Sequence, residues 1–134
     1  MWRIILGVEE EVSSFVLPMG ATVNMDGTSL YLAVAAVFIA QAFGMNLSLE
    51  AQLGIVATAT LSSIGTAGVP GASVTMLVII LEQAGIPEAG LALIFAVDRP
   101  LDMLRTVVNV TGDAAVSMVV AKSVGKLGEP KKKD

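Results

Sequence analysis

The chain has 134 residues, of which 54% are hydrophobic and 15% are charged, with a formal net charge of −4 and a mean hydropathy of +0.79. Soluble domains carry about 25% charged residues, so this composition argues against a soluble fold and favours a membrane protein. The absence of cysteine excludes disulfides and thiolate metal sites, and the absence of histidine removes the usual ligands of zinc and the usual base of catalytic triads.

The first apolar segment, residues 12–43, is interrupted near its middle by the run Asn24-Met25-Asp26-Gly27-Thr28. Asn, Asp and Gly disfavour helix interiors and favour turns. We therefore predict one broken transmembrane helix, whose freed backbone groups must be buried in protein or face water. The alternative is a turn outside the membrane, followed by a single helix that begins at Thr28.

The second segment, residues 48–84, contains a long uncharged tract that cannot be one continuous helix. Ser48, followed by Glu50, suits a helix N-cap. Three glycines and Pro70 lie within residues 65–71, at a cost of ~1 kcal/mol per glycine and ~3 kcal/mol for proline inside a helix. We predict a re-entrant hairpin of two half-length helices, 51–61 and 72–81. Two short helices joined by a surface loop are the alternative.

The third segment, residues 88–122, follows Pro87 and is predicted to be a final transmembrane helix that begins near Ala89. Residues 123–134 form a polar tail, whose lysines we expect to be solvated rather than bound to nucleic acid. Basic residues precede the first crossing and follow the last, which places both ends in the cytoplasm by the positive-inside rule. The expected fold class is an all-α multi-pass membrane protein.

Polar side chains form a stripe on this last helix. At about 100° per residue, the members of the stripe fall within roughly 80° of one another. A charge at bilayer depth costs at least ~2.5 kcal/mol, and such residues usually face a site or a pathway. A purely structural ion pair between Asp102 and Arg105 is the alternative. The stripe consists of Asp98 at its edge, Asp102, Arg105, Asn109 and Asp113, with Thr106 bordering it.

The chemistry of these residues indicates a ligand that carries carboxylate and ammonium groups and is bound together with a cation. Arg105 offers a planar fork for a carboxylate, and Asp102 can pair with an ammonium group. The oxygens of Asn24, Asp26 and Asp113 suit small alkali cations, and broken helices add free N–H and carbonyl groups. An acidic amino acid accompanied by a cation fits this set. Asp98 and the off-stripe Arg99 receive no role in ligand binding.

Three motifs closely resemble the dicarboxylate/amino acid:cation symporters, the glutamate transporter family. They are GATVNMDGTSLY at residues 20–31, SSIGTAGVPGA at residues 62–72 and DMLRTVVNVTGD at residues 102–113. The resemblance extends from about Gly7 to Gly125. It implies the seventh transmembrane helix, the second re-entrant hairpin and the eighth helix of a transport domain. The whole protein would be a homotrimer in a prokaryotic plasma membrane, and we expect the chain to be a fragment of it.

The resemblance also implies the contacts with an acidic amino acid. Arg105 would bind its side-chain carboxylate, Asp102 its amino group and Asn109 its α-carboxylate. Further contacts would come from Thr28 beside Arg105, and from Thr106 and the carbonyl of Val69 beside Asp102.

Sodium is the expected coupling ion, with protons as the alternative, and no other cofactor is expected. The resemblance implies a hairpin tip that closes as a gate only when ion and substrate are both bound. It implies three sodium sites: one formed by Asn24, Asn109, Asp113 and the carbonyl of Gly20; a second formed by carbonyls of Thr22, Ser63, Ile64 and Thr66 near the sulfur of Met25; and a third that includes Asn24 and Asp26.

We therefore expect a symporter of glutamate or aspartate rather than an enzyme. Two residues depart from the expected pattern: Ser73 stands where several family members have glycine, and Pro100 should kink the last helix. A C4-dicarboxylate or neutral amino acid symporter is the alternative within the family. From other classes, the alternatives are a channel and an intramembrane aspartyl protease that uses two of Asp26, Asp102 and Asp113.

Overall fold

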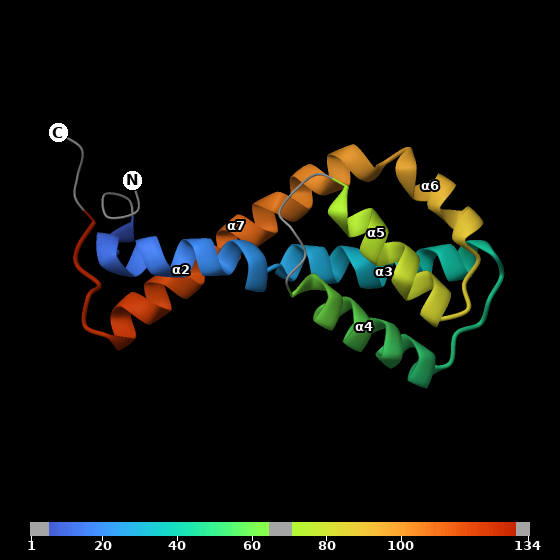
Figure 1. Ribbon diagram of the computed structural model, residues 1–134, viewed down its shortest axis with the longest axis horizontal. Helices are drawn as coiled ribbons and strands as arrows, with labels where there is room; N and C mark the ends of the chain where they lie inside the picture. Colours follow the sequence, from blue (N-terminus) through green and yellow to red (C-terminus); the bar gives the residue numbers. More distant parts are fainter. Residues whose placement is uncertain (1–5, 65–70, 131–134) are drawn as a thin grey trace.

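The computed structural model describes residues 6–64 and 71–130 (Figure 1). Within these ranges the regular secondary structure is helical, with turns between the helices and one isolated antiparallel bridge between Val8 and Leu127, as the predicted all-α fold class requires. Two described segments, Glu10–Ala42 and Asp98–Ser123, are long and apolar enough to cross a membrane. The predicted roles of Thr66 and Val69 fall outside the described residues.

The first apolar segment forms two helices, α2 (Glu10–Val23) and α3 (Asp26–Ala42), which lie nearly end to end (Figure 1). Asn24 and Met25 separate them, with ψ angles of 64° and 56° in place of helical values. The predicted break is therefore confirmed at the first two residues of the predicted run, whereas Asp26, Gly27 and Thr28 already belong to α3. The break leaves the first N–H groups of α3 without partners inside that helix.

The second segment forms α4 (Leu49–Ser63) and α5 (Ala72–Gln83), which run in opposite directions and both pack on α3 (Figure 1). The Ser48 side chain accepts a hydrogen bond of 3.2 Å from Ala51 N, which confirms the predicted N-cap. At 1.5 Å per residue, α4 and α5 are about 22 Å and 18 Å long, less than the ~30 Å of a hydrocarbon core. The predicted half-length arms are therefore present.

The third segment is not the single helix that we predicted from Ala89. It contains a 3₁₀ turn, η1 (Glu88–Gly90), a short helix, α6 (Leu91–Phe95), and a long helix, α7 (Asp98–Ser123). Pro100 explains the division, because its ring would clash with the carbonyl of the residue four positions earlier, Ala96, in a continuous helix. The break falls at that point.

The predicted kink at Pro100 itself was wrong, because the helix is interrupted four residues earlier instead. Pro100 is the third residue of α7 and lies in its first turn, where an N–H group would have no partner inside the helix. Proline is well tolerated there, so α7 begins before Pro100 and continues without interruption to Ser123.

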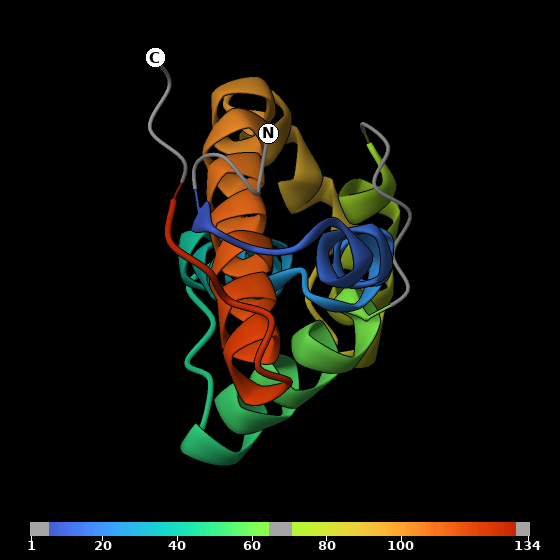
Figure 2. The same ribbon diagram turned by 90° about the vertical axis from the view of Figure 1, so that its left-hand side faces the viewer.

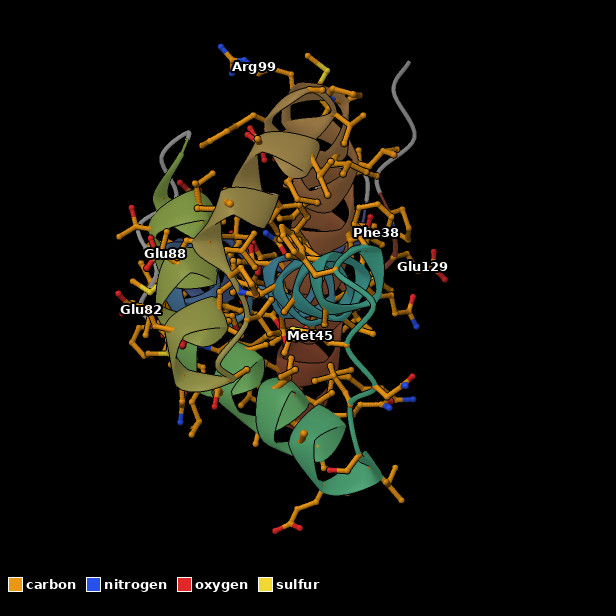
Figure 3. The ribbon with its side chains drawn as sticks, turned by 90° about the vertical axis from the view of Figure 1, so that its right-hand side faces the viewer. Phe38, Met45, Glu82, Glu88, Arg99 and Glu129 are labelled. Carbon is orange, nitrogen blue, oxygen red and sulfur yellow. The ribbon has the colours of Figure 1, made fainter. Side chains whose placement is uncertain are left out.

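The main hydrophobic core surrounds α3, which Figure 3 shows end-on among the other helices. Leu32 and Ile39 of α3, Leu77 and Ile80 of α5, and Ala59 of α4 are almost completely buried. The α7 helix packs against both α2 and α3, and Figure 2 shows α2 nearly end-on beside the length of α7. The α2–α3 break is therefore brought against the polar stripe of α7.

Candidate functional site

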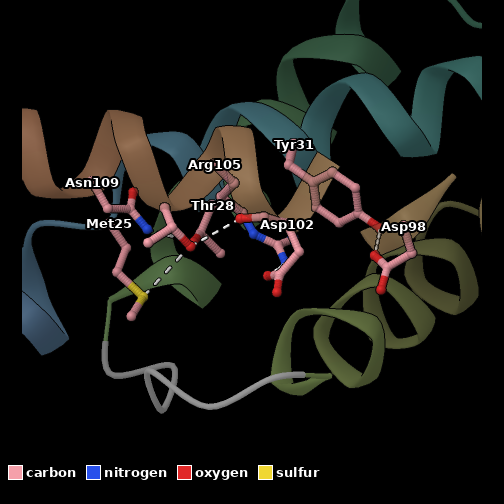
Figure 4. Close-up of polar contacts among 8 residues, drawn as sticks. Met25, Thr28, Tyr31, Asp98, Asp102, Arg105 and Asn109 are labelled. Atoms are coloured by element: carbon pink, nitrogen blue, oxygen red, sulfur yellow. Dashed lines mark hydrogen bonds and ion pairs between the residues drawn. The ribbon is translucent and has the colours of Figure 1, made fainter. Parts of the chain in front are cut away.

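Arg105 is the most deeply buried charged residue of the stripe, with an exposed fraction of 7%. It forms an ion pair with Asp102 one turn earlier on α7. Its guanidinium carbon also lies 4.3 Å from the centroid of the Tyr31 ring on α3, within range of a cation–π contact (Figure 4). The guanidinium is thus held from two helices.

One nitrogen of this guanidinium is not used by the protein. Among the described residues, Arg105 Nη1 is buried without a hydrogen-bond partner. A buried unsatisfied donor costs about 1–3 kcal/mol, and more when it is charged. The arrangement therefore favours an anion that accepts a hydrogen bond at this nitrogen.

An apolar groove of about 450 Å³ begins beside Arg105 and Tyr31. Its lining includes Val34 and Phe38 of α3 and Leu101 of α7. Apolar walls lower the local dielectric, so the charge of Arg105 acts more strongly than it would in water.

Asn109 connects α7 to the start of α3. Its Oδ1 accepts a hydrogen bond of 2.8 Å from Gly27 N, and its Nδ2 donates to Thr28 Oγ1 over 3.2 Å. Thr28 Oγ1 in turn donates to Met25 Sδ over 3.7 Å. A free N–H group created by the helix break is therefore satisfied by a side chain of the stripe.

Glycine at position 27 allows this close approach. A Cβ atom built there would lie 2.5 Å from the carbonyl oxygen of Arg105 and 3.0 Å from Val108 Cβ. Backbone cannot yield as a flexible side chain can, so any larger residue would push α3 away from α7.

Oxygen donors gather on the other side of the break. Asn24 Nδ2 donates to Asp113 Oδ1 over 3.0 Å, and a Cβ atom at Gly112 would lie 3.1 Å from both Asn24 Nδ2 and Asp26 Oδ2. Asp113 also lies directly against Gly20. The bond to Asn24 uses one carboxylate oxygen of Asp113, so its second oxygen and the Asn24 carbonyl remain for a cation.

Other predicted residues bond locally rather than to the centre of the site. Thr22 Oγ1 donates to Met19 O over 3.0 Å, and Thr106 Oγ1 donates to Asp102 O over 2.9 Å; both residues are exposed. These bonds use the hydroxyl hydrogen of each threonine and leave its oxygen able to accept a hydrogen bond.

The end of α4 holds two more predicted residues. Ser63 is buried, and its hydroxyl donates to Thr60 O over 2.8 Å. Ile64 is the exposed C-cap of α4, with extended backbone angles that end the helix. The backbone carbonyls of both residues lie at the open end of the helix, where intrahelical partners run out.

Sequence reasoning gave no role to Tyr31 or Asp98. Tyr31 OH donates to Asp98 Oδ1 over 2.9 Å, which joins α3 to the first turn of α7 (Figure 4). A signal was available, since Tyr31 is the only tyrosine of the chain and a buried phenol needs a hydrogen-bond partner. Arg99 points outward, as expected for a residue off the stripe (Figure 3).

Comparison with known proteins shows to which family the chain belongs. Residues 4–123 match the sodium:dicarboxylate symporter family, and this match covers most of the chain. The chain belongs to this family. The resemblance drawn from the three motifs is thereby confirmed.

Named relatives of this family member include animal and bacterial transporters. Excitatory amino acid transporter 3 of Oryctolagus cuniculus is 54% identical over 115 residues, which are 86% of this chain and 22% of the relative. Excitatory amino acid transporter of Caenorhabditis elegans is 50% identical over 115 residues, or 86% of this chain and 23% of the relative. The proton/sodium-glutamate symport protein of Bacillus caldotenax is 42% identical over 127 residues, or 95% of this chain and 30% of the relative.

This family member therefore spans less than a third of the length of these relatives. The family and the relatives are transporters, as the expectation of a non-enzymatic protein requires. The aspartyl protease alternative gains no support from them.

Proposed function

We propose that this chain forms the substrate- and ion-binding core of a symporter that carries glutamate or aspartate together with sodium by alternating access. The observation that carries the proposal is Arg105, which is buried, paired with Asp102 and left with Nη1 unsatisfied among the described residues. A buried charged donor that lacks an acceptor, such as Nη1, is costly unless a ligand completes its hydrogen bonds.

Substrate recognition follows from the groups around Arg105. The side-chain carboxylate of the substrate accepts a hydrogen bond from Nη1, and the ammonium group pairs with Asp102, which stays partly exposed beside Arg105. Asn109 binds the α-carboxylate, because its Nδ2 carries a second hydrogen besides the one donated to Thr28. Thr106 and the Val69 carbonyl complete the proposed contacts.

Sodium is the proposed coupling ion because the donors near the break are hard oxygens. One site uses Asn24, Asn109, Asp113 and the carbonyl of Gly20. A second uses carbonyls of Thr22, Ser63, Ile64 and Thr66 near Met25, and a third includes Asn24 and Asp26. Carboxylate and carbonyl oxygens are the ligands that hard cations prefer in proteins.

The names of the relatives support both parts of the proposal. The Bacillus caldotenax protein is named a proton/sodium-glutamate symport protein, and the rabbit protein an excitatory amino acid transporter. The first name includes protons as well as sodium, so protons are the alternative coupling ion.

The proposed membrane arrangement follows from the lengths of the helices and the positions of the lysines. The α4–α5 pair enters the membrane from outside as a re-entrant hairpin, and its tip closes over bound substrate and ion. Both ends of the chain lie in the cytoplasm, with Lys122 and Lys126 following α7. The complete transporter is a homotrimer in a prokaryotic plasma membrane.

A chimera tests the function. This chain replaces the 127 matching residues of the Bacillus caldotenax protein, and the purified chimera is reconstituted in proteoliposomes. We expect an inward sodium gradient to drive uptake of labelled glutamate or aspartate. Unlabelled succinate and alanine should compete poorly, because the first lacks an ammonium group and the second a side-chain carboxylate.

The Arg105→Gln variant tests the residue that carries the proposal. It should abolish uptake of acidic amino acids while leaving the amount of folded chimera unchanged. Thr111→Val is the matched control on the same helix, because the exposed Thr111 hydroxyl donates to Val107 O of its own helix over 2.7 Å. Sodium-driven uptake of succinate or alanine in preference to glutamate would contradict the substrate assignment.

A further inference from the structure

Arg105 can select a carboxylate only if its guanidinium is held in one orientation, because the side chain has many rotamers and a planar group of donors. Its ion pair with Asp102 fixes Nη2 but leaves rotation about that contact open. The second restraint comes from the face of the Tyr31 ring, 4.3 Å from the guanidinium carbon. The orientation of this ring therefore decides where Nη1 points.

The ring itself is restrained at its far end. Tyr31 OH donates to Asp98 Oδ1 over 2.9 Å, and Tyr31 is 9% exposed within the main core. Hydrogen bonds to a charged acceptor are about twice as strong as neutral ones. The ring is thus tied between the core of α3 and the start of α7.

Pro100 accounts for the position of Asp98. Because a continuous helix would bring its ring against the carbonyl of Ala96, α7 begins at Asp98. Asp98 then lies in the first turn of α7, and Arg105 lies seven residues, or about two turns, further along the same helix. This spacing puts Asp98 at the hydroxyl of Tyr31 and Arg105 over its ring (Figure 4).

We propose that Tyr31 and Asp98 are positioning residues, which hold the guanidinium of Arg105 in the orientation that binds the substrate carboxylate. The inference rests on the proposed function for the identity of the ligand. Neither residue touches the substrate; both act through Arg105. The contacts of Tyr31 with Asp98 and Arg105 set the affinity for acidic substrates and leave the sodium sites near Asn24 unaffected.

Uptake by the chimera gives the first test. Tyr31→Leu should raise the KM for glutamate roughly tenfold, the scale of a lost desolvated cation–π contact, with little change in the maximal rate per folded transporter. Tyr31→Phe keeps the ring and loses the hydroxyl, so its effect should be smaller. Asp98→Ala should match Tyr31→Phe, whereas Asp98→Asn keeps an acceptor oxygen and should restore most of the affinity.

Four outcomes of these measurements separate positioning from a structural role. Measured at saturating glutamate, the sodium concentration for half-maximal uptake should stay the same in all four variants, and the Thr111→Val control should have the parent KM. A fall in maximal rate or in folded protein with an unchanged KM would overturn the proposal. So would Asp98→Asn behaving as Asp98→Ala.

A second measurement does not depend on transport. Phenylglyoxal modifies arginine, and peptide mass spectrometry of the purified chimera can compare Arg105 with the exposed Arg99 as internal standard. Tyr31→Leu and Asp98→Ala should increase the modification of Arg105 relative to Arg99 severalfold. An unchanged ratio would overturn the positioning role. If the parent chimera takes up no acidic amino acid and the two variants still show this increase, the result would count against the proposed function alone.

Discussion

Asn24 Nδ2 in the break between α2 and α3 lies 3.0 Å from Asp113 Oδ1 on α7, although 89 positions separate the two residues in the sequence. The bond joins the break in one candidate membrane span to the polar stripe of the other. The Asp113 charge is therefore placed where α2 ends, and the negative end of the α2 dipole adds to its attraction for a cation.

Replacing Asp113 by asparagine should weaken sodium coupling without unfolding the protein. The amide oxygen can still accept a hydrogen bond from Asn24, but the negative charge is lost. Since the attraction between two unit charges about 4 Å apart near a protein surface is of the order of 4 kcal/mol, we expect the sodium concentration for half-maximal glutamate uptake to rise at least tenfold. Sodium titrations of uptake by the chimera measure this value. An unchanged sodium dependence would exclude Asp113 from the cation site.

Gly20→Ala should damage the same region by steric pressure. A Cβ atom at position 20 would meet the Asp113 carboxylate, whereas one at Gly54 on α4 has no neighbour within 4 Å among the described atoms. Overpacking typically costs 1–3 kcal/mol, so we expect a lower Tm and less stabilisation by added sodium. Gly54→Ala is the matched control and should raise stability by up to ~1 kcal/mol. Equal Tm values for the two variants would contradict the close packing of Gly20.

Much of the fold can be predicted from local chemistry. The Asn24–Met25 break, the Ser48 cap and the two short arms all follow from residues whose backbone preferences are strong. The α6–α7 division was missed because Pro100 acts on a residue four positions earlier. A proline marks a disturbance in the sequence, but whether it becomes a kink or a helix start depends on the packing around it.

The residues of the candidate site could be predicted where a polar or charged side chain interrupts an apolar helix, but not where the residue type is common in a core. Asp102, Arg105, Asn109 and Asp113 are conspicuous in an apolar helix, and the structure brings Asn109 and Asp113 against the α2–α3 break. Tyr31 was overlooked because an aromatic residue in an apolar segment is expected in the core. Its contact with Asp98 crosses from α3 to α7, and periodicity along one helix cannot reveal such a pairing.

A hydrogen bond and an ion pair join the two ends of the described chain, and the strength of the ion pair should depend on pH. Gly128 N donates to Gly7 O over 2.9 Å, and Lys126 forms an ion pair with Glu11. The hydrogen bond to Glu11 raises the pKa of Lys126 above its ordinary value near 10.5. The ion pair is therefore fully present below that ordinary value and is lost as the pH rises through the raised pKa of the folded chain.

Lys126→Gln tests this pH dependence. The variant should have a slightly lower Tm than the parent at about pH 8, and the difference should shrink as the pH is raised beyond the ordinary range of lysine. The effect is small because both side chains are in contact with solvent. Glu11→Gln should show the same trend, and combining the two changes should add nothing further. A Tm difference that stays constant with pH would show that the pair contributes nothing.

Pro100→Ala should remove the cause of the α6–α7 division. The variant regains an N–H group at position 100 and loses the ring that opposes the Ala96 carbonyl, so helix can extend through Val97. We expect slower hydrogen exchange of the amides of residues 97–101, together with a higher KM for glutamate, because Asp98 is drawn away from Tyr31. Pro87→Ala, at the exposed residue before η1, is the matched control and should change neither. Slower exchange with an unchanged KM would mean that the start of α7 and the placement of Arg105 are independent.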